Sequence, residues 1–266
     1  MNNFITYILS FNLPSLVLVV FAALAVSSET GFWIGHLLLR STFKKFKVVL
    51  DDNSSTITNS SLGLLALFLG FTFSSAMEHF ELNREAVVKE ASAINSVYQY
   101  TKLLPEPYHK EIYNELNHYI DVRLETGKTR GVDHSVLEVE ERSKKVQSSL
   151  WKLIGEVSNK EKDSPAVSNL LSAMNDLVNA ELTRTEYLLN NVPNGLFVPV
   201  GLFLLFNGVF LGVSLSEGEN RHILLSWGLY LLVALSVAII IDLDRPLTGL
   251  IDINQNAIEK LKINDS

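Results

Sequence analysis

Three long runs without a charged residue are each long enough to cross a membrane as a helix. They comprise 21 residues from Ile57 to Met77, 25 from Val192 to Ser216 and 19 from Ile223 to Ile241. A helix needs about 20 apolar residues to span the hydrocarbon core. Near the N-terminus, 36 residues from Phe4 to Leu39 are interrupted only by Glu29, so we place one further span at Val17 to Leu39 or slightly earlier. The pattern predicts four transmembrane helices.

Between the second and third spans the chain keeps a helical period but becomes polar on one side. The second helix is expected to continue to Leu103, where Leu104-Pro105-Glu106-Pro107 ends it. Three more amphipathic helices follow, and the last of them opens at Ser164-Pro165. The chain leaves the bilayer with the first helix of this domain and must return to the same side of the bilayer for the third span. The domain therefore needs an even number of helices. The predicted fold is therefore all-α, with an antiparallel four-helix bundle inserted between two pairs of spans and continuous with the second.

Each bundle helix carries an apolar stripe that predicts its buried face. The predicted stripes are Val87, Ala91, Ile94 and Tyr98; Tyr108, Ile112, Leu116 and Tyr119; Val139, Val146, Leu150, Leu153 and Val157; and Val167, Leu171, Met174, Val178 and Glu181. The sequence therefore predicts four segments. Residues 1–77 contain the first two spans, with a basic connecting loop at 40–57, and residues 78–192 form the bundle. Residues 193–245 contain the last two spans, and residues 246–266 form a C-terminal tail.

Composition excludes several classes of protein. Hydrophobic residues make up 47% of the chain and charged ones 19%, which is too apolar a composition for an ordinary soluble domain. There is no cysteine, and the six histidines show no metal-ligand spacing. Residues 78–192 hold 19 acidic and 14 basic side chains, which argues against a nucleic-acid partner. No phosphate loop or nucleophile motif is present, so we expect no enzyme, cofactor or metal.

Two features inside the apolar spans are candidates for function or for packing. Glu29 is an acidic residue within the first span, and a carboxylate there either belongs to a pore or ion pathway or reaches water at the interface. Two G-x-x-x-G pairs, Gly31 with Gly35 and Gly208 with Gly212, predict close helix contact, within the chain first and between copies second.

The second span has a face of small side chains. Gly63, Ala66, Gly70, Ser74 and Met77 share it, with phenylalanines elsewhere on the helix. Small residues allow another helix to approach, and they also leave room for a narrow pore. Packing is the commoner use of such a face, and both interpretations stay open.

One long motif runs from Gly63 to Ser74 and on through Asn83 to Asn95, with Arg84, Glu90 and Asn95 among its polar residues. A second runs from Asp242 to Gly249, including Asp244, Arg245 and Pro246, and Glu29-Thr30-Gly31 is a short motif in the first span. These two long motifs and the short one resemble those of a bacterial bestrophin-like family of unknown function. The spacing of the aspartates fits no calcium loop, so a capped helix end is the favoured interpretation of the second motif.

The family is distantly similar to bestrophins, pentameric anion channels whose second span lines the pore. That resemblance implies a homo-oligomeric membrane channel passing inorganic ions. The chain lacks the acidic run that forms the calcium clasp of those channels. The alternative is a membrane-anchored sensor or scaffold that acts through its bundle without ion conduction.

Basic residues predict the orientation in a bacterial plasma membrane. On one side of the membrane there are five basic residues: Arg40, Lys44, Lys45 and Lys47 before the second span and Arg221 after the third. On the other side there are three near the membrane: Arg84, Lys89 and Arg245. The positive-inside rule then places the bundle outside the cytoplasm, opposite to the bestrophin arrangement.

Overall fold

The computed structural model describes residues 12–40, 44–126, 133–161, 163–190, 194–217, 223–245 and 250–262. All regular structure within these residues is helical. The chain forms two compact units, residues 1–78 with 192–244 and residues 79–191 with 245–266. Arg221 and Pro246, both named by the sequence analysis, lie outside the described residues.

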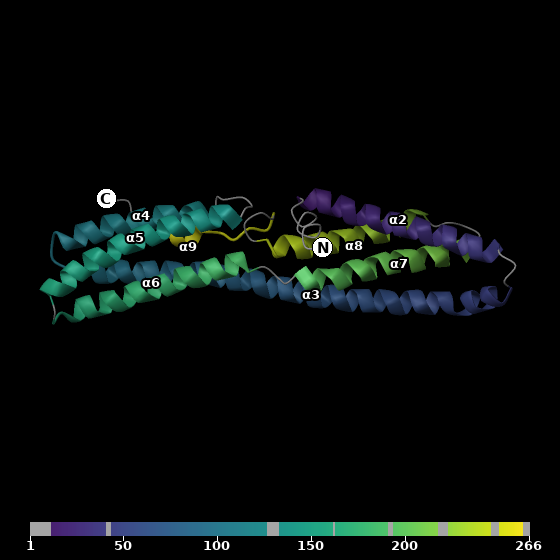
Figure 1. The fold of residues 1–266 in the computed structure, drawn as a ribbon, viewed down its shortest axis with the longest axis horizontal. Helices are drawn as coiled ribbons and strands as arrows, with labels where there is room; N and C mark the ends of the chain where they lie inside the picture. The colour runs from purple at the N-terminus through teal and green to yellow at the C-terminus, as the bar shows by residue number, and fades with distance from the viewer. Residues whose placement is uncertain are drawn as a thin grey trace. The chain divides into compact units, whose positions relative to one another are not determined.

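The first unit contains the four predicted spans (Figure 1). They are α2 (Leu13–Arg40), the first part of α3 (Lys44–Thr101), α7 (Phe197–Glu217) and α8 (Ile223–Leu243), and a short 3-10 turn, η1 (Asn194–Leu196), precedes α7. Each is long and apolar enough to cross a bilayer. The chain is thus an all-α membrane protein with four candidate spans.

The connection between the first two spans is shorter than predicted. A loop was expected over residues 40–57, but α3 already begins at Lys44. The prediction relied on the Ser, Thr and Asn residues between 51 and 61, which favour turns. That run contains no glycine or proline to break a helix, and hydroxyl side chains remain in helices by bonding to a carbonyl one turn back.

The second unit is built from the end of α3 with α4 (Tyr108–Thr126), α5 (Asp133–Lys160) and α6 (Pro165–Leu189). Their apolar stripes meet in one core, in which Ile112, Leu150, Ile154, Leu170 and Met174 are fully buried. The helix ends agree with the turn signals in the sequence, since α4 follows the Pro105–Pro107 segment and α6 begins at Pro165.

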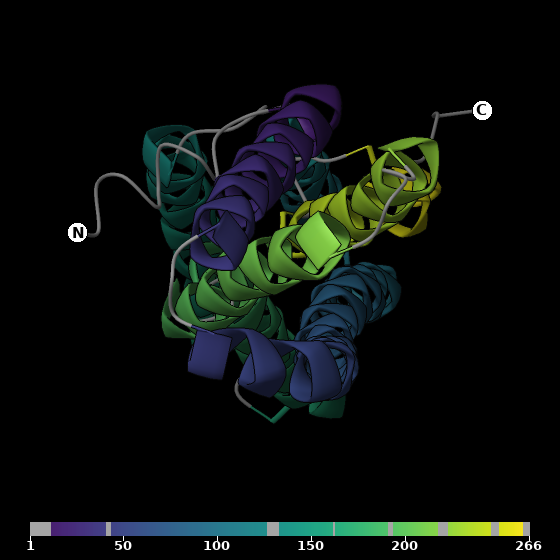
Figure 2. The same ribbon diagram turned by 90° about the vertical axis from the view of Figure 1, so that its right-hand side faces the viewer.

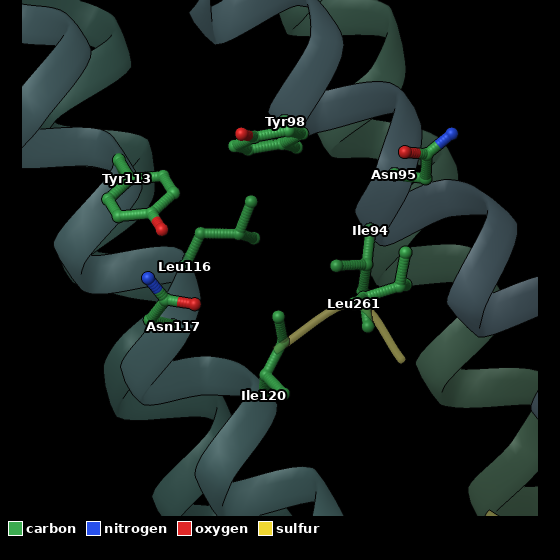
Figure 3. A pocket seen from close by; sticks show the side chains of 8 residues that line it. All are labelled: Ile94, Asn95, Tyr98, Tyr113, Leu116, Asn117, Ile120 and Leu261. Carbon is green, nitrogen blue, oxygen red and sulfur yellow. The ribbon is translucent and has the colours of Figure 1, made fainter. Parts of the chain in front are cut away.

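The C-terminal residues belong to this second core, although the sequence suggested only a tail. Ile253 and Ile258 are buried there, and α9 (Asn256–Glu259) forms a single turn. Leu261 lies beside Ile94 and Ile120, where these three help to line a very small cavity between α3 and α4 (Figure 3). Lys262 Nζ also lies 2.6 Å from Asp121 Oδ1. Burial of these apolar side chains explains why the segment is ordered.

The core predicts the effect of a charge placed on α5. Leu150 is 0% exposed, so Leu150→Asp should lower the free energy of unfolding by several kcal/mol, about 3 to 5, because an unpaired carboxylate would be buried. Leu137→Asp, on the same helix at a 44% exposed position, is the matched control and should cost less than about 1 kcal/mol. Thermal melts of the full-length protein in detergent would measure both; equal midpoints would contradict the assigned core.

Candidate functional site

One face of α3 attaches the helix to the rest of the first unit. Its buried residues recur three, four or seven apart, as expected for one helical face: Thr58, Ser61, Leu65, Thr72 and Ala76. This face lies against α7. Phe68 stacks on Phe203 with ring centroids 4.8 Å apart, and the side-chain amide of Asn207 donates to the carbonyl oxygen of Ser61 at 3.4 Å.

The small-residue face of α3 points away from that contact. At 100° per residue, Gly63, Ala66, Gly70, Ser74 and Met77 lie on the side of the helix opposite the buried residues. All five are exposed within the chain. A Cβ atom added at Gly63 or Gly70 would meet no other atom within 4 Å. No described residue of the same chain therefore packs on this face.

The four glycines of the G-x-x-x-G pairs lie in a different environment. A Cβ atom at Gly31 would overlap the backbone of Val209, and one at Gly212 would overlap the backbone of Ser28. Gly35 and Gly208 face serine side chains in the same contact between α2 and α7. The structure thus places these glycines where two helices cross within one chain.

Glu29 lies on α2, away from the α3 face. Figures 1 and 2 show α7 between α2 and α3. Glu29 instead lines a cavity of about 120 Å³ whose walls come from α2, α7 and α8 among the described residues. Beside it, the Tyr230 hydroxyl donates to Ser28 Oγ at 2.5 Å. The monomer therefore does not bring Glu29 together with Gly70 and Ser74.

The second unit contains a buried network of charged side chains that the sequence analysis did not assemble. Glu90, on α3, accepts from Arg123 Nε at 2.5 Å and from Arg184 Nη1 at 2.5 Å. Arg123 Nη1 also lies 3.4 Å from Glu181. All four side chains are at most 5% exposed, and their formal charges sum to zero.

Neutral groups complete the network. The Tyr119 hydroxyl lies within hydrogen-bond distance of both acids, 2.9 Å from Glu90 and 3.2 Å from Glu181. Gln147, on α5, donates to Glu181. Arg184 Nη2 donates to Gln255 Oε1 at 2.9 Å, so a residue of the C-terminal segment also belongs to the network. Every element of the second unit's core thus contributes a group.

The two acids differ in their electrostatics. Burial by itself would raise the pKa of Glu90, but Arg123 and Arg184 together lower it to about 2. Burial raises the pKa of Glu181 above its ordinary value, and Arg123 opposes this only in part. Glu90 is therefore the more firmly ionised acid and the centre of the network.

The motif residues are placed at several locations. Arg84 is exposed and pairs with Glu81 at 3.1 Å, and Asn95 lines the small cavity near Leu261 (Figure 3). Asp242 and Asp244 are buried at the end of α8 and the residue after it. No group of three metal-ligating side chains occurs among the described residues. Of the predicted motif residues, Glu90 belongs to the charge network.

Removing the charge of Glu90 should destabilise the protein strongly. Glu90→Gln leaves two buried arginines without their shared carboxylate, so the free energy of unfolding should fall by about 3 to 5 kcal/mol. Glu85→Gln, five residues earlier on the same helix, removes only an exposed contact of 4.0 Å to Lys89 and should cost less than about 1 kcal/mol. Chemical denaturation of the full-length protein in detergent would compare them.

The interaction of Glu90 with Arg123 and Arg184 also predicts that the stability of the protein depends on pH. The folded pKa of Glu90 is lowered from 4.5 to about 2, so the ionised acid stabilises the fold above pH 4.5 and this contribution is lost as the pH falls towards 2. The difference between the native protein and Glu90→Gln should therefore be largest above about pH 5 and shrink below it. A difference that is constant from pH 7 to pH 3 would contradict the ionised pair.

Comparison with known proteins gives the relationship of the chain. A family model described as a Bestrophin-like domain matches residues 21–258. No curated protein matches. Crystal structures of variants of a bacterial bestrophin homologue from Klebsiella pneumoniae share the fold: one has a TM-score of 0.66 at 14% identity, covering 92% of this chain and 96% of that one. Another has a TM-score of 0.65 at 15% identity with the same coverage. The chain belongs to the bestrophin-like family.

Proposed function

We propose that the protein is a homo-oligomeric ion channel whose pore is lined by the small-residue face of α3. The observation that carries this proposal is the orientation of that face. Gly63, Ala66, Gly70 and Ser74 point away from the residues that attach α3 to α7. Several copies arranged around an axis would bring these faces together and enclose a narrow path.

Lipid is a poor partner for this face. A lipid-facing helix surface usually carries large apolar side chains, as α8 does around Gly228, where Leu224, Leu225, Leu231 and Leu232 are all exposed. The corresponding neighbours of Gly70 are Ala66 and Ser74, four residues away, and the exposed Leu67 and Phe73, three residues away, so only two of the four are large. Small groups and a hydroxyl suit a hydrated path or a neighbouring subunit better than acyl chains.

One helix per chain is enough for such a path only if the protein is oligomeric. Within the first unit, α2, α7 and α8 form the body and α3 lies at one side of it (Figure 2). The α3 segment from Gly63 to Met77 bears no charged residue, so permeating inorganic ions would meet the Ser74 hydroxyl and small side chains there. Partners in this proposal are the bilayer, further copies of the chain and the ions.

Added volume on this face should block conduction. Gly70→Leu should reduce ion flux into liposomes by about tenfold or more, because the extra side chain is repeated around the axis. Gly228→Leu is the matched control, since it also has no atom within 4 Å of an added Cβ but faces the leucine patch. It should leave flux unchanged. Flux of chloride and potassium would be measured after size-exclusion profiles show the same assembly.

The results separate the channel from the sensor or scaffold. Equal flux for Gly70→Leu and the native oligomer would remove the pore assignment. No flux from the native protein under any ion gradient would favour the alternative, a protein that acts through its bundle. A fall in flux with a normal elution profile, seen only for Gly70→Leu, would support the pore.

We further propose that the bundle lies outside the cytoplasm. The basic residues Arg40, Lys44, Lys45 and Lys47 precede the second span, and such residues concentrate on the cytoplasmic side. Because the chain has no cysteine, Asn159→Cys provides a unique label at an exposed position near the end of α5. It should react with a membrane-impermeant maleimide in intact cells. Labelling that appears only after lysis would reverse the orientation.

A further inference from the structure

One tyrosine hydroxyl lies between the two buried acids of the charge network. The Tyr119 oxygen is 2.9 Å from Glu90 Oε1 and 3.2 Å from Glu181 Oε2. A tyrosine hydroxyl has one proton, so it can donate to only one of the two carboxylates. The shorter distance and the lowered pKa of Glu90, about 2, assign that proton to the contact with Glu90. The contact between Tyr119 and Glu181 then has no proton unless Glu181 itself carries one.

The other partners of Glu181 are distant or neutral. Its Oε1 atom is 3.4 Å from Arg123 Nη1, at the long limit for a hydrogen bond, whereas Arg123 Nε approaches Glu90 at 2.5 Å. On α5, the side-chain amide of Gln147 donates to Oε2, and the buried Ser143 also faces the acid. Arg123 is thus shared unequally, and Glu90 is the acid that it neutralises more closely.

The charged groups on the surrounding helices act on Glu181 in both directions. From α3, Glu90 repels a second negative charge, and from α4, Arg123 attracts it. From α5, Lys144 also attracts it, but Lys144 is exposed and lies 2.5 Å from Glu140. Burial, together with the repulsion from Glu90, outweighs these attractions and raises the pKa of Glu181 above 4.5.

Neither protonation state of Glu181 satisfies the whole network. The ionised acid balances the charges of Arg123, Arg184 and Glu90, but it leaves two oxygens facing each other at Tyr119 with no proton between them. The protonated acid can donate to Tyr119, which donates to Glu90, but it leaves one positive charge uncompensated in the core. Each state supplies what the other lacks, so a change of pH can exchange them.

We propose that Glu181 is a proton-binding switch in the core of the bundle. With a proton bound, a hydrogen bond from Glu181 to the Tyr119 oxygen joins α6 to α4. When the proton leaves to water, that bond is lost and the carboxylate is held by Arg123, which also pairs with Glu90. Proton binding therefore changes which side chain of α4 holds α6. The switch lies within the second unit and requires no ion conduction.

The effect on stability has a definite sign. An acid whose folded pKa is raised still holds its proton in the folded protein at a pH where the unfolded chain has lost it. The contribution of Glu181 to stability is therefore present near pH 4.5 and is lost as the pH rises through its folded pKa. The contribution of Glu90 changes only below pH 4.5 and in the opposite direction. Measurements above pH 4.5 thus report on Glu181 rather than on Glu90.

Glu181→Gln is the first test, because its amide can donate to Tyr119 as the protonated acid does. Chemical denaturation of the full-length protein in detergent, from about pH 4.5 to about pH 8, would compare it with the native protein. The unfolding equilibrium constant of the native protein, divided by that of the variant, should rise with pH by up to about tenfold per pH unit. Glu186→Gln, at an exposed position on the same helix, is the matched control and should follow the native protein. A ratio for Glu181→Gln that is constant or falls with pH would overturn the proposal.

Infrared spectroscopy of the same samples detects the proton itself. The native protein should show a protonated-carboxyl C=O band that is lost towards alkaline pH, is missing from Glu181→Gln and is unchanged in Glu186→Gln. If Glu181→Gln does not fold, Tyr119→Phe provides the test. It removes the oxygen that accepts the proton, so the frequency of the band should shift. Absence of the band from the native protein, or an identical band in every folded variant, would refute the switch.

Discussion

The second unit depends on the neutralisation of charges that its folding buries. Isolated, any one of Glu90, Arg123, Glu181 and Arg184 would cost several kcal/mol in the core. Together they form a network with no net charge, in which Glu90 contacts both arginines at 2.5 Å. Because these four residues come from α3, α4 and α6, the helices must adopt one register for all the partners to meet. Apolar packing alone would tolerate several registers, so the network adds specificity as well as stability.

The same network fixes the C-terminal segment. Arg184 uses a second nitrogen for Gln255, and Ile253 and Ile258 bury their side chains in the surrounding core. Ordering this segment costs conformational entropy, and burial of two isoleucines with one charge-assisted hydrogen bond offsets it. The sequence analysis treated residues 246–266 as a tail, and only the structure shows that this segment contacts Arg184 and the surrounding core.

Much of the fold could be predicted from the sequence, and the charge network could not. Long uncharged runs and proline positions locate the spans and the bundle helices, except that α3 begins at Lys44, well before the predicted end of the loop at residue 57. The period of the α4 stripe, Ile112, Leu116 and Tyr119, continues to Arg123, which places a charge on the buried face. Glu90 and Arg184 likewise fall beside the stripes of α3 and α6. A charged residue at a core position predicts that a partner exists, but periodicity within one helix cannot identify a partner on another.

The glycines show the same limit and lead to the functional argument. In the sequence, each spaced pattern of glycines or small residues in the spans predicts close approach, by another helix or around a narrow pore. The structure separates them, since Gly31 and Gly212 meet backbone of their own chain and Gly63 and Gly70 meet nothing within 4 Å. A glycine within a helix costs up to about 1 kcal/mol relative to alanine. The close packing of α2 against α7 offsets that cost for Gly31 and Gly212. For Gly63 and Gly70 no described atom of the same chain offsets it, and Ala66 and Ser74 extend the same small surface. In the proposed channel, a neighbouring copy or the path between copies would supply that compensation.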